Sequence, residues 1–150
     1  MLKQLIEQDI KTALLDRDTV RVTTLRGLKS AILYAEVAAN ARDTGLPEDV
    51  VQAILVKESK KRQESADLYE QGKDSVRAEA ELAEKAIIDA YLPKPLSDEE
   101  LSALVDTVIL EVGDTSPQAM GKVIAGVKEK SKGSADGGRI AQLVKERLSK

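Results

Sequence analysis

The sequence predicts an all-α protein: a four-helix N-terminal part followed by a small three-helix C-terminal domain. Apolar residues recur at spacings of three and four along most of the chain, which is the period of a helix with one buried face. No segment shows the alternating β-branched pattern that is typical of a strand. The chain has no Phe, no Trp and 3 Tyr, so the core must be built from aliphatic side chains, which pack well between helices.

Four helices are expected before the first proline-rich segment. The first covers residues 2–14, and the second resumes near Thr19 after a polar turn. The third opens at Pro47, since proline suits the first helical turn, and stops at Gly72. Asp74 is expected to cap the fourth. The positions expected to face inward are Leu2, Leu5, Ile6, Ile10, Ala13 and Leu14; Val22, Leu25, Leu28, Ile32, Ala35 and Ala39; Val50, Val51, Ile54 and Leu55; and Val76, Leu82, Ala83, Ala86, Ile87 and Ala90.

Pro93 and Pro95 mark a boundary between an N-terminal helical domain, residues 1–95, and a C-terminal domain, residues 96–150. Two prolines in three residues push their predecessors toward extended geometry and exclude a continuous helix. A domain of about 55 residues has a small core and is expected to be marginally stable alone.

Three helices are expected after the boundary. Ser97, with Glu100 three residues later, forms a capping box that opens the fifth helix. Ser116 and Pro117 supply an N-cap and a first-turn proline for the sixth helix. Asp136 is expected to cap the last helix.

The residue types that are absent restrict the chemistry. The chain has no His and no Cys, so the commonest general base, metal ligand and thiol nucleophile are missing. We therefore expect no metal site and no cofactor, and no residue pattern supports catalysis.

Composition also predicts a location. No apolar run approaches the roughly 18 residues that span a membrane, and the first residues form an amphipathic helix instead of a signal peptide. The absence of cysteine fits a reducing compartment. The sequence thus predicts a soluble, cytoplasmic protein with no membrane partner.

Residues 120–139 combine helical glycines with a basic, glycine-rich loop. Gly121 and Gly126 lie inside a predicted helix, where each costs about 1 kcal/mol relative to alanine. Three more glycines follow, at Gly133, Gly137 and Gly138. This pattern indicates that something approaches the backbone closely, and tight helix packing is the competing explanation.

Charge is uneven along the chain, whose net charge is −3. Residues 96–115 hold six acidic and no basic residues, which gives −6, and residues 116–150 hold eight basic and three acidic residues, which gives +5. This positive end can contact phosphates, or it can pair with the acidic fifth helix.

A second group of charges lies where the third helix is expected to be buried, next to basic residues of the second helix. It forms either an ion-pair network between helices or a basic groove that binds a phosphate backbone by shape, because no aromatic residue is placed to stack bases. The groove candidates are Arg26, Lys29, Lys57, Lys60, Lys61 and Arg62, with Glu58 and Ser65 on the same face.

Essentially the whole chain resembles the YqeY family, whose C-terminal part is similar to the tail domain of the B subunit of the aminoacyl-tRNA amidotransferase. The landmarks are Arg26 with Leu28 and Lys29, the charged run 57–65, Tyr91-Leu92-Pro93, the segment Met120–Val123 and the loop Lys132–Gly137. The last two landmarks together are specific. Ser134 stands where the family usually has an arginine.

The resemblance implies a helical two-part protein whose tail contacts tRNA. It also implies a set of RNA contacts in the C-terminal domain, with two glycines that allow close approach. These residues are Lys122, Lys128, Lys130, Lys132 and Arg139, with Gly121 and Gly133.

Three functions follow from the resemblance. The first is a non-catalytic module associated with tRNA as its partner. The alternative is an adaptor that docks onto components of a synthetase or amidotransferase complex. The third, which the family name implies, is a carbon–nitrogen ligase with glutamine as amido-N donor. We rank it last because the chain lacks the glutaminase and kinase-like parts that such chemistry needs.

Overall fold

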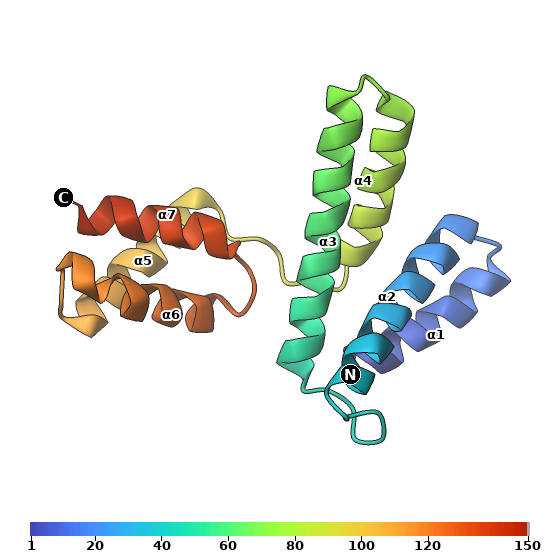
Figure 1. The fold of residues 1–150 in the computed structure, drawn as a ribbon, viewed down its shortest axis with the longest axis horizontal. Helices are drawn as coiled ribbons and strands as arrows, with labels where there is room; N and C mark the ends of the chain where they lie inside the picture. The colour runs from blue at the N-terminus through green and yellow to red at the C-terminus, as the bar shows by residue number, and fades with distance from the viewer. Residues whose placement is uncertain (150) are drawn as a thin grey trace. The chain divides into compact units, whose positions relative to one another are not determined.

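A computed structural model describes residues 1–149, and every regular element in that range is a helix (Figure 1). No strand occurs among these residues, so the prediction of an all-α protein is confirmed. The elements are α1 (Leu2–Leu15), α2 (Thr19–Ala38), α3 (Glu48–Gln71), α4 (Ser75–Asp89), α5 (Asp98–Val112), the short 3-10 helix η1 (Pro117–Ala119), α6 (Met120–Ser131) and α7 (Gly137–Leu148).

The chain forms two compact units, Met1–Leu92 and a second that begins at Pro93. The first contains α1 to α4, and the second contains α5 to α7. That the units are separate domains with a boundary at residues 95 and 96 stays a prediction.

The first unit consists of two helical hairpins, α1 with α2 and α3 with α4 (Figure 1). Because α2 also contacts α3 and α4, the two hairpins share one core. The buried residues of this core come from all four helices: Ile6, Ile10, Leu25, Leu28, Ile32, Val51, Leu55 and Ile88.

The boundaries of α3 and α4 lie largely where the sequence predicts them. The carboxylate of Asp74 accepts a hydrogen bond of 3.1 Å from the backbone N–H of Arg77, which confirms the predicted cap of α4. Gly72 follows the last residue of α3, as predicted, but the left-handed conformation falls on Lys73, whose φ is 57°. The turn therefore places a non-glycine residue in a conformation that favours glycine.

The predicted buried face of α4 is wrong. Val76 is 76% exposed and Leu82 is 42% exposed, whereas Ala78 and Ile88 are fully buried. Of the other predicted positions, Ile87 is partly buried and Ala83, Ala86 and Ala90 are exposed. In the other helices Leu5, Leu14, Ala39 and Val50, also expected to face inward, are exposed.

The contacts between α3 and α4 explain this orientation. The hydroxyl of Ser59, which is buried, donates to a carboxylate oxygen of Asp89 at 2.5 Å. The guanidinium of Arg62 contacts Glu84 at 3.0 Å. Because α3 offers polar groups to α4, the polar side of α4 faces α3 and satisfies them. The helical period of α4 identifies an apolar face but not the chemistry of the neighbouring helix.

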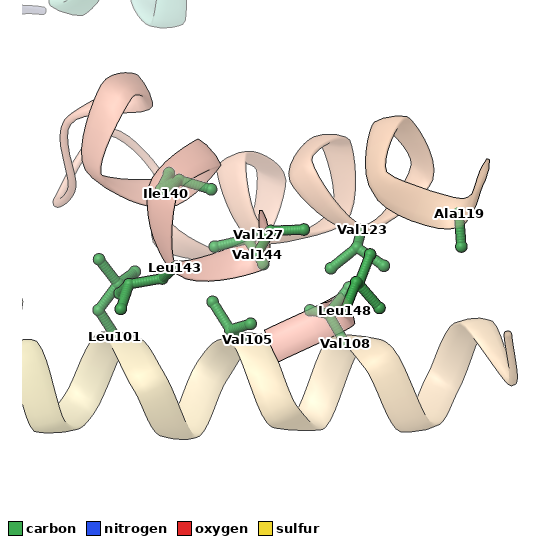
Figure 2. Close-up of a cluster of buried hydrophobic side chains, with 10 residues drawn as sticks. All are labelled: Leu101, Val105, Val108, Ala119, Val123, Val127, Ile140, Leu143, Val144 and Leu148. Carbon is green, nitrogen blue, oxygen red and sulfur yellow. The ribbon is translucent and has the colours of Figure 1, made fainter. Parts of the chain in front are cut away.

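The core of the second unit lies between α5, α6 and α7. Figure 2 shows side chains of α5 pointing toward those of the other two helices. The buried residues are Leu101, Val105, Val108, Ala119, Val123, Val127, Ile140, Leu143, Val144 and Leu148. They are all aliphatic, as the composition predicts.

Two helices of this unit, α5 and α7, begin at side-chain caps that the sequence predicts. The predicted capping box of Ser97 and Glu100 is present at α5, with both reciprocal hydrogen bonds. Asp136 caps α7 by accepting from the N–H of Arg139 at 3.2 Å, also as predicted. The sixth helix differs: Pro117 starts a 3-10 turn, the α-helix begins only at Met120, and the Ser116 side chain makes no cap hydrogen bond.

Within residues 1–149, no helix combines the length and the apolar character that crossing a bilayer requires.

Candidate nucleic-acid interface

The two unusual glycines of α6 have different surroundings. A Cβ added to Gly126 would lie 2.8 Å from Cγ1 of Val108, so only glycine lets α6 approach α5 this closely. A Cβ added to Gly121 would meet no atom within 4 Å. Helix packing therefore accounts for Gly126, but packing within the unit does not account for Gly121.

Gly121 belongs to an exposed face of α6. Gly121, Ala125 and Lys128 follow at spacings of four and three, so they lie along one side of the helix, and all three are exposed. Lys132 comes directly after α6 in a left-handed conformation, with φ 47°, and Gly133 follows with φ 81°. The side of α6 opposite the core therefore presents both exposed glycine backbone and basic side chains.

Lys128 reaches the start of α7. Its Cε and Nζ lie 3.4 and 3.6 Å from the position that a Cβ on Gly137 would occupy. The N-terminus of a helix carries a partial positive charge and unpaired N–H groups, so an ammonium group there favours an anion. The carboxylate of Asp136 caps the same turn and opposes this effect.

Two of the predicted RNA contacts are paired with the acidic helix α5. Nζ of Lys130 lies 2.6 Å from Glu111, and Nε of Arg139 lies 3.1 Å from Asp98. Arg139 also donates to the side chain of Gln142 at 3.2 Å. The ion-pair explanation of the positive end therefore holds for these two cations, and phosphate contacts stay a prediction.

Lys122 is exposed near the start of α6. Hydrogen bonds from Ser116 lower the pKa of the Asp114 carboxyl, and the charge of Lys122 lowers it further. Lys122 therefore belongs to the surface of the second unit and lies near an acidic group at the end of α5.

The groove candidates of the first unit are largely engaged in ion pairs. Arg62 contacts both Glu84 and Glu58 at 3.0 Å, and Lys61 contacts Glu58 at 2.8 Å. Burial raises the pKa of Glu58, but hydrogen bonds and charge from Lys61 and Arg62 outweigh this effect, so the pKa is lowered. This arrangement favours the ion-pair network.

The remaining groove candidates lie on the outside of the same helices. Lys29 of α2 contacts Glu7 of α1 at 3.2 Å. Arg26, Lys57 and Lys60 are exposed. Arg62, Lys61 and Lys29 are therefore paired with carboxylates. This leaves less support for a basic groove in the first unit than for phosphate contacts in the second.

Several polar contacts of the first unit join residues that no sequence pattern connects. Glu36 is completely buried and accepts two hydrogen bonds from Nζ of Lys3, at 2.8 and 2.9 Å. The hydroxyl of Tyr91 donates to Asp9, and burial together with this carboxylate raises the pKa of Tyr91 to about 12. The partners are 33 and 82 residues apart, so no local pattern identifies them.

Two further observations concern ligands. A shallow, open hollow on α7 is lined by Gln142, Lys145, Glu146 and Ser149, of which Lys145 is the basic residue. Among the described residues, no three carboxylate, His or Cys side chains are grouped so as to hold a metal ion.

These features define a class: an all-helical protein of two units whose second unit presents basic side chains and exposed glycine backbone along one helix. The family profile described as Yqey-like protein matches residues 3–148, and the chain belongs to this family. The resemblance seen in the sequence is thereby confirmed.

Three curated relatives carry the name Altered inheritance of mitochondria protein 41, mitochondrial. The Kluyveromyces lactis protein is 30% identical over 124 residues, which cover 81% of this chain and 65% of the relative. The Lachancea thermotolerans protein is 31% identical over 75% of this chain and 60% of the relative, and the Eremothecium gossypii protein 33% over 73% and 60%. The chain thus spans less than two thirds of the length of these relatives.

The relatives' names contradict the predicted cytoplasmic location, since each name assigns its protein to mitochondria. The prediction depended on the absence of cysteine and of a long apolar run. Both properties are compatible with more than one compartment, so composition alone does not distinguish them.

Proposed function

We propose that the second unit is a non-catalytic, tRNA-associated module that contacts folded RNA through the exposed face of α6 and the first turn of α7. The observation that carries the proposal is Gly121, which no neighbour among residues 1–149 explains and which shares a face with Lys128. A glycine costs a helix roughly 0.5–1 kcal/mol relative to alanine. Close approach of a phosphate backbone would account for this cost.

Charge supports the same surface. Residues 116–150 carry a local +5 in a chain whose net charge is −3, so attraction to RNA phosphates is expected at those cations of this part that are not paired with α5. Lys128 places an exposed cation next to the N-terminus of α7, a helix end that favours anions. The resemblance to the tRNA-contacting tail domain gives this surface its proposed partner.

Binding of unfractionated tRNA, measured by filter retention at several salt concentrations, tests the proposal. We expect affinity to fall steeply as salt rises, because phosphate contacts release counterions. Gly121→Ala should weaken binding severalfold while slightly raising the melting temperature. Gly27→Ala, a matched change in α2, should leave binding unchanged. The proposal fails if the protein does not bind tRNA at low salt.

A second candidate is an adaptor that docks onto components of a synthetase or amidotransferase complex. Two large apolar side chains of α4, Val76 and Leu82, are exposed and favour it, because exposed apolar surface can mark protein contacts. In a pull-down with these components, Leu82→Glu should reduce capture, and Glu79→Gln serves as the control. Equal capture by Leu82→Glu and the unaltered protein would reject α4 as the docking face.

The ligase hypothesis ranks third, because it rests on the family name alone. Ammonia released from glutamine by the purified protein, above the blank, would reverse this ranking.

A further inference from the structure

The acidic helix α5 is paired with two of the cations that the family resemblance implies as RNA contacts, Lys130 and Arg139. Glu111 in its last turn contacts Lys130 of α6, and Asp98 in its first turn contacts Arg139 of α7. With a rise of 1.5 Å per residue, the two carboxylates are attached about 20 Å apart along α5. One helix thus pairs, at both of its ends, with cations from the two helices of the proposed interface.

We propose that Asp98 and Glu111 act as internal competitors of RNA phosphates, so that α5 holds the tRNA affinity of the second unit below the value that its cations alone would give. This inference rests on the proposed function and specifies how that interface is regulated. A carboxylate and a phosphate present similar oxygen acceptors to ammonium and guanidinium groups. Each cation can therefore exchange one partner for the other.

Exposure makes this exchange possible without unfolding. The side chains of Lys130 and Glu111 are 42% and 53% exposed, and those of Arg139 and Asp98 are 37% and 74% exposed. Ion pairs this accessible to water are weak and easily screened. They are strong enough to compete with single phosphate contacts and too weak to prevent RNA from displacing them.

The surrounding residues separate competition from a general charge effect. Arg147 and Asp106 form a third pair between α7 and α5, at 3.5 Å, outside the proposed RNA contacts. Lys128 takes part in no ion pair among residues 1–149. We therefore expect Lys128 to bind phosphate without competition, and Lys130 and Arg139 only after they leave α5.

A double-mutant cycle with unfractionated tRNA tests the inference. The change Asp98→Asn with Glu111→Gln should increase affinity roughly three- to tenfold near 0.1 M salt, as expected for releasing two exposed pairs. In a background with Lys130→Gln and Arg139→Gln, the same acidic changes should give little gain.

A matched control removes the same charge elsewhere in the unit. Glu99→Gln with Asp106→Asn neutralises two carboxylates of α5 that pair with none of the implied RNA contacts among the described residues. The change in tRNA affinity of this control measures the general loss of charge repulsion. Asp98→Asn with Glu111→Gln should increase affinity by more than the control does. Because Asp98 also stabilises the first turn of α5, Glu111→Gln alone provides a second variant, and circular dichroism checks that each variant is folded.

The outcomes distinguish the two proposals. If the unaltered protein binds tRNA but the acidic changes raise affinity equally with and without Lys130 and Arg139, the proposed competition is wrong. A gain in affinity no larger than that of the control variant would also reject it. Either result leaves the proposed tRNA-associated module unaffected. Absence of tRNA binding by every variant and by the unaltered protein would overturn the proposed function and this inference with it. A gain that requires Lys130 and Arg139 supports both.

Discussion

At the scale of single residues, Gly121 and Gly126 look alike in the sequence and differ in their surroundings. They lie five positions apart on α6, yet Gly126 faces Val108 across a buried contact, and no atom among the described residues would meet a side chain at Gly121. Each glycine lowers the stability of the helix relative to alanine, but the reason for its presence differs between the two positions. For Gly126 the explanation lies within the unit, and for Gly121 we propose that it lies in a bound RNA.

The pair of glycines gives a prediction for stability. Gly126→Ala should lower the free energy of unfolding by about 1–2 kcal/mol, because overpacking against buried Val108 exceeds the gain in helix propensity. Gly121→Ala should raise it by up to about 1 kcal/mol. Urea denaturation followed by circular dichroism measures both. A stabilised Gly126→Ala variant would show that α5 and α6 can move apart at little cost.

At the scale of elements, α4 shows how a neighbouring helix determines orientation. Its apolar side carries Val76 and Leu82 and is exposed, while Ala78 and Ile88 pack inward beside polar groups. Arg62 and Ser59 of α3 need acceptors, and Glu84 and Asp89 of α4 supply them. Leaving such partly buried polar groups without partners is costly, which favours the observed orientation of α4.

This orientation predicts unequal effects of substitution along α4. Leu82→Glu should change the free energy of unfolding by no more than about 0.5 kcal/mol, because the site is exposed. Ile88→Ala should lower it by about 2–5 kcal/mol, because it removes a fully buried side chain. Chemical denaturation compares the two variants. A large loss for Leu82→Glu and a small loss for Ile88→Ala would show that the apolar face of α4 is buried after all.

At the scale of the whole molecule, the two units have different cores. The first core draws on all four helices and is supplemented by polar contacts between distant residues, such as Lys3 with Glu36 and Tyr91 with Asp9. The second core is aliphatic and smaller. A chain of about 60 residues buries only about 60% of its unfolded surface, so such a unit is marginal.

The size of the second unit predicts its behaviour when isolated. A fragment covering residues 93–150 should be helical at low temperature and melt well below the full chain, as followed by circular dichroism. A melting temperature equal to that of the full chain would mean that this small core suffices by itself.

The sequence by itself determined the helical class, the approximate ends of each helix and the family. These features depend on local chemistry: the period of apolar residues, the oxygen of Asp74, Ser97 or Asp136 that accepts a backbone N–H, and short motifs such as Met120–Val123. The sequence also selected a set of basic residues in the C-terminal part.

Only the tertiary structure decided how those residues are used. It paired Lys130 and Arg139 with α5, set Lys128 beside the start of α7, and engaged Arg62 with Glu84 of α4. It also turned the apolar side of α4 outward and separated the roles of Gly121 and Gly126. Each of these outcomes depends on a partner on another helix. A periodic pattern along one helix carries no information about that partner.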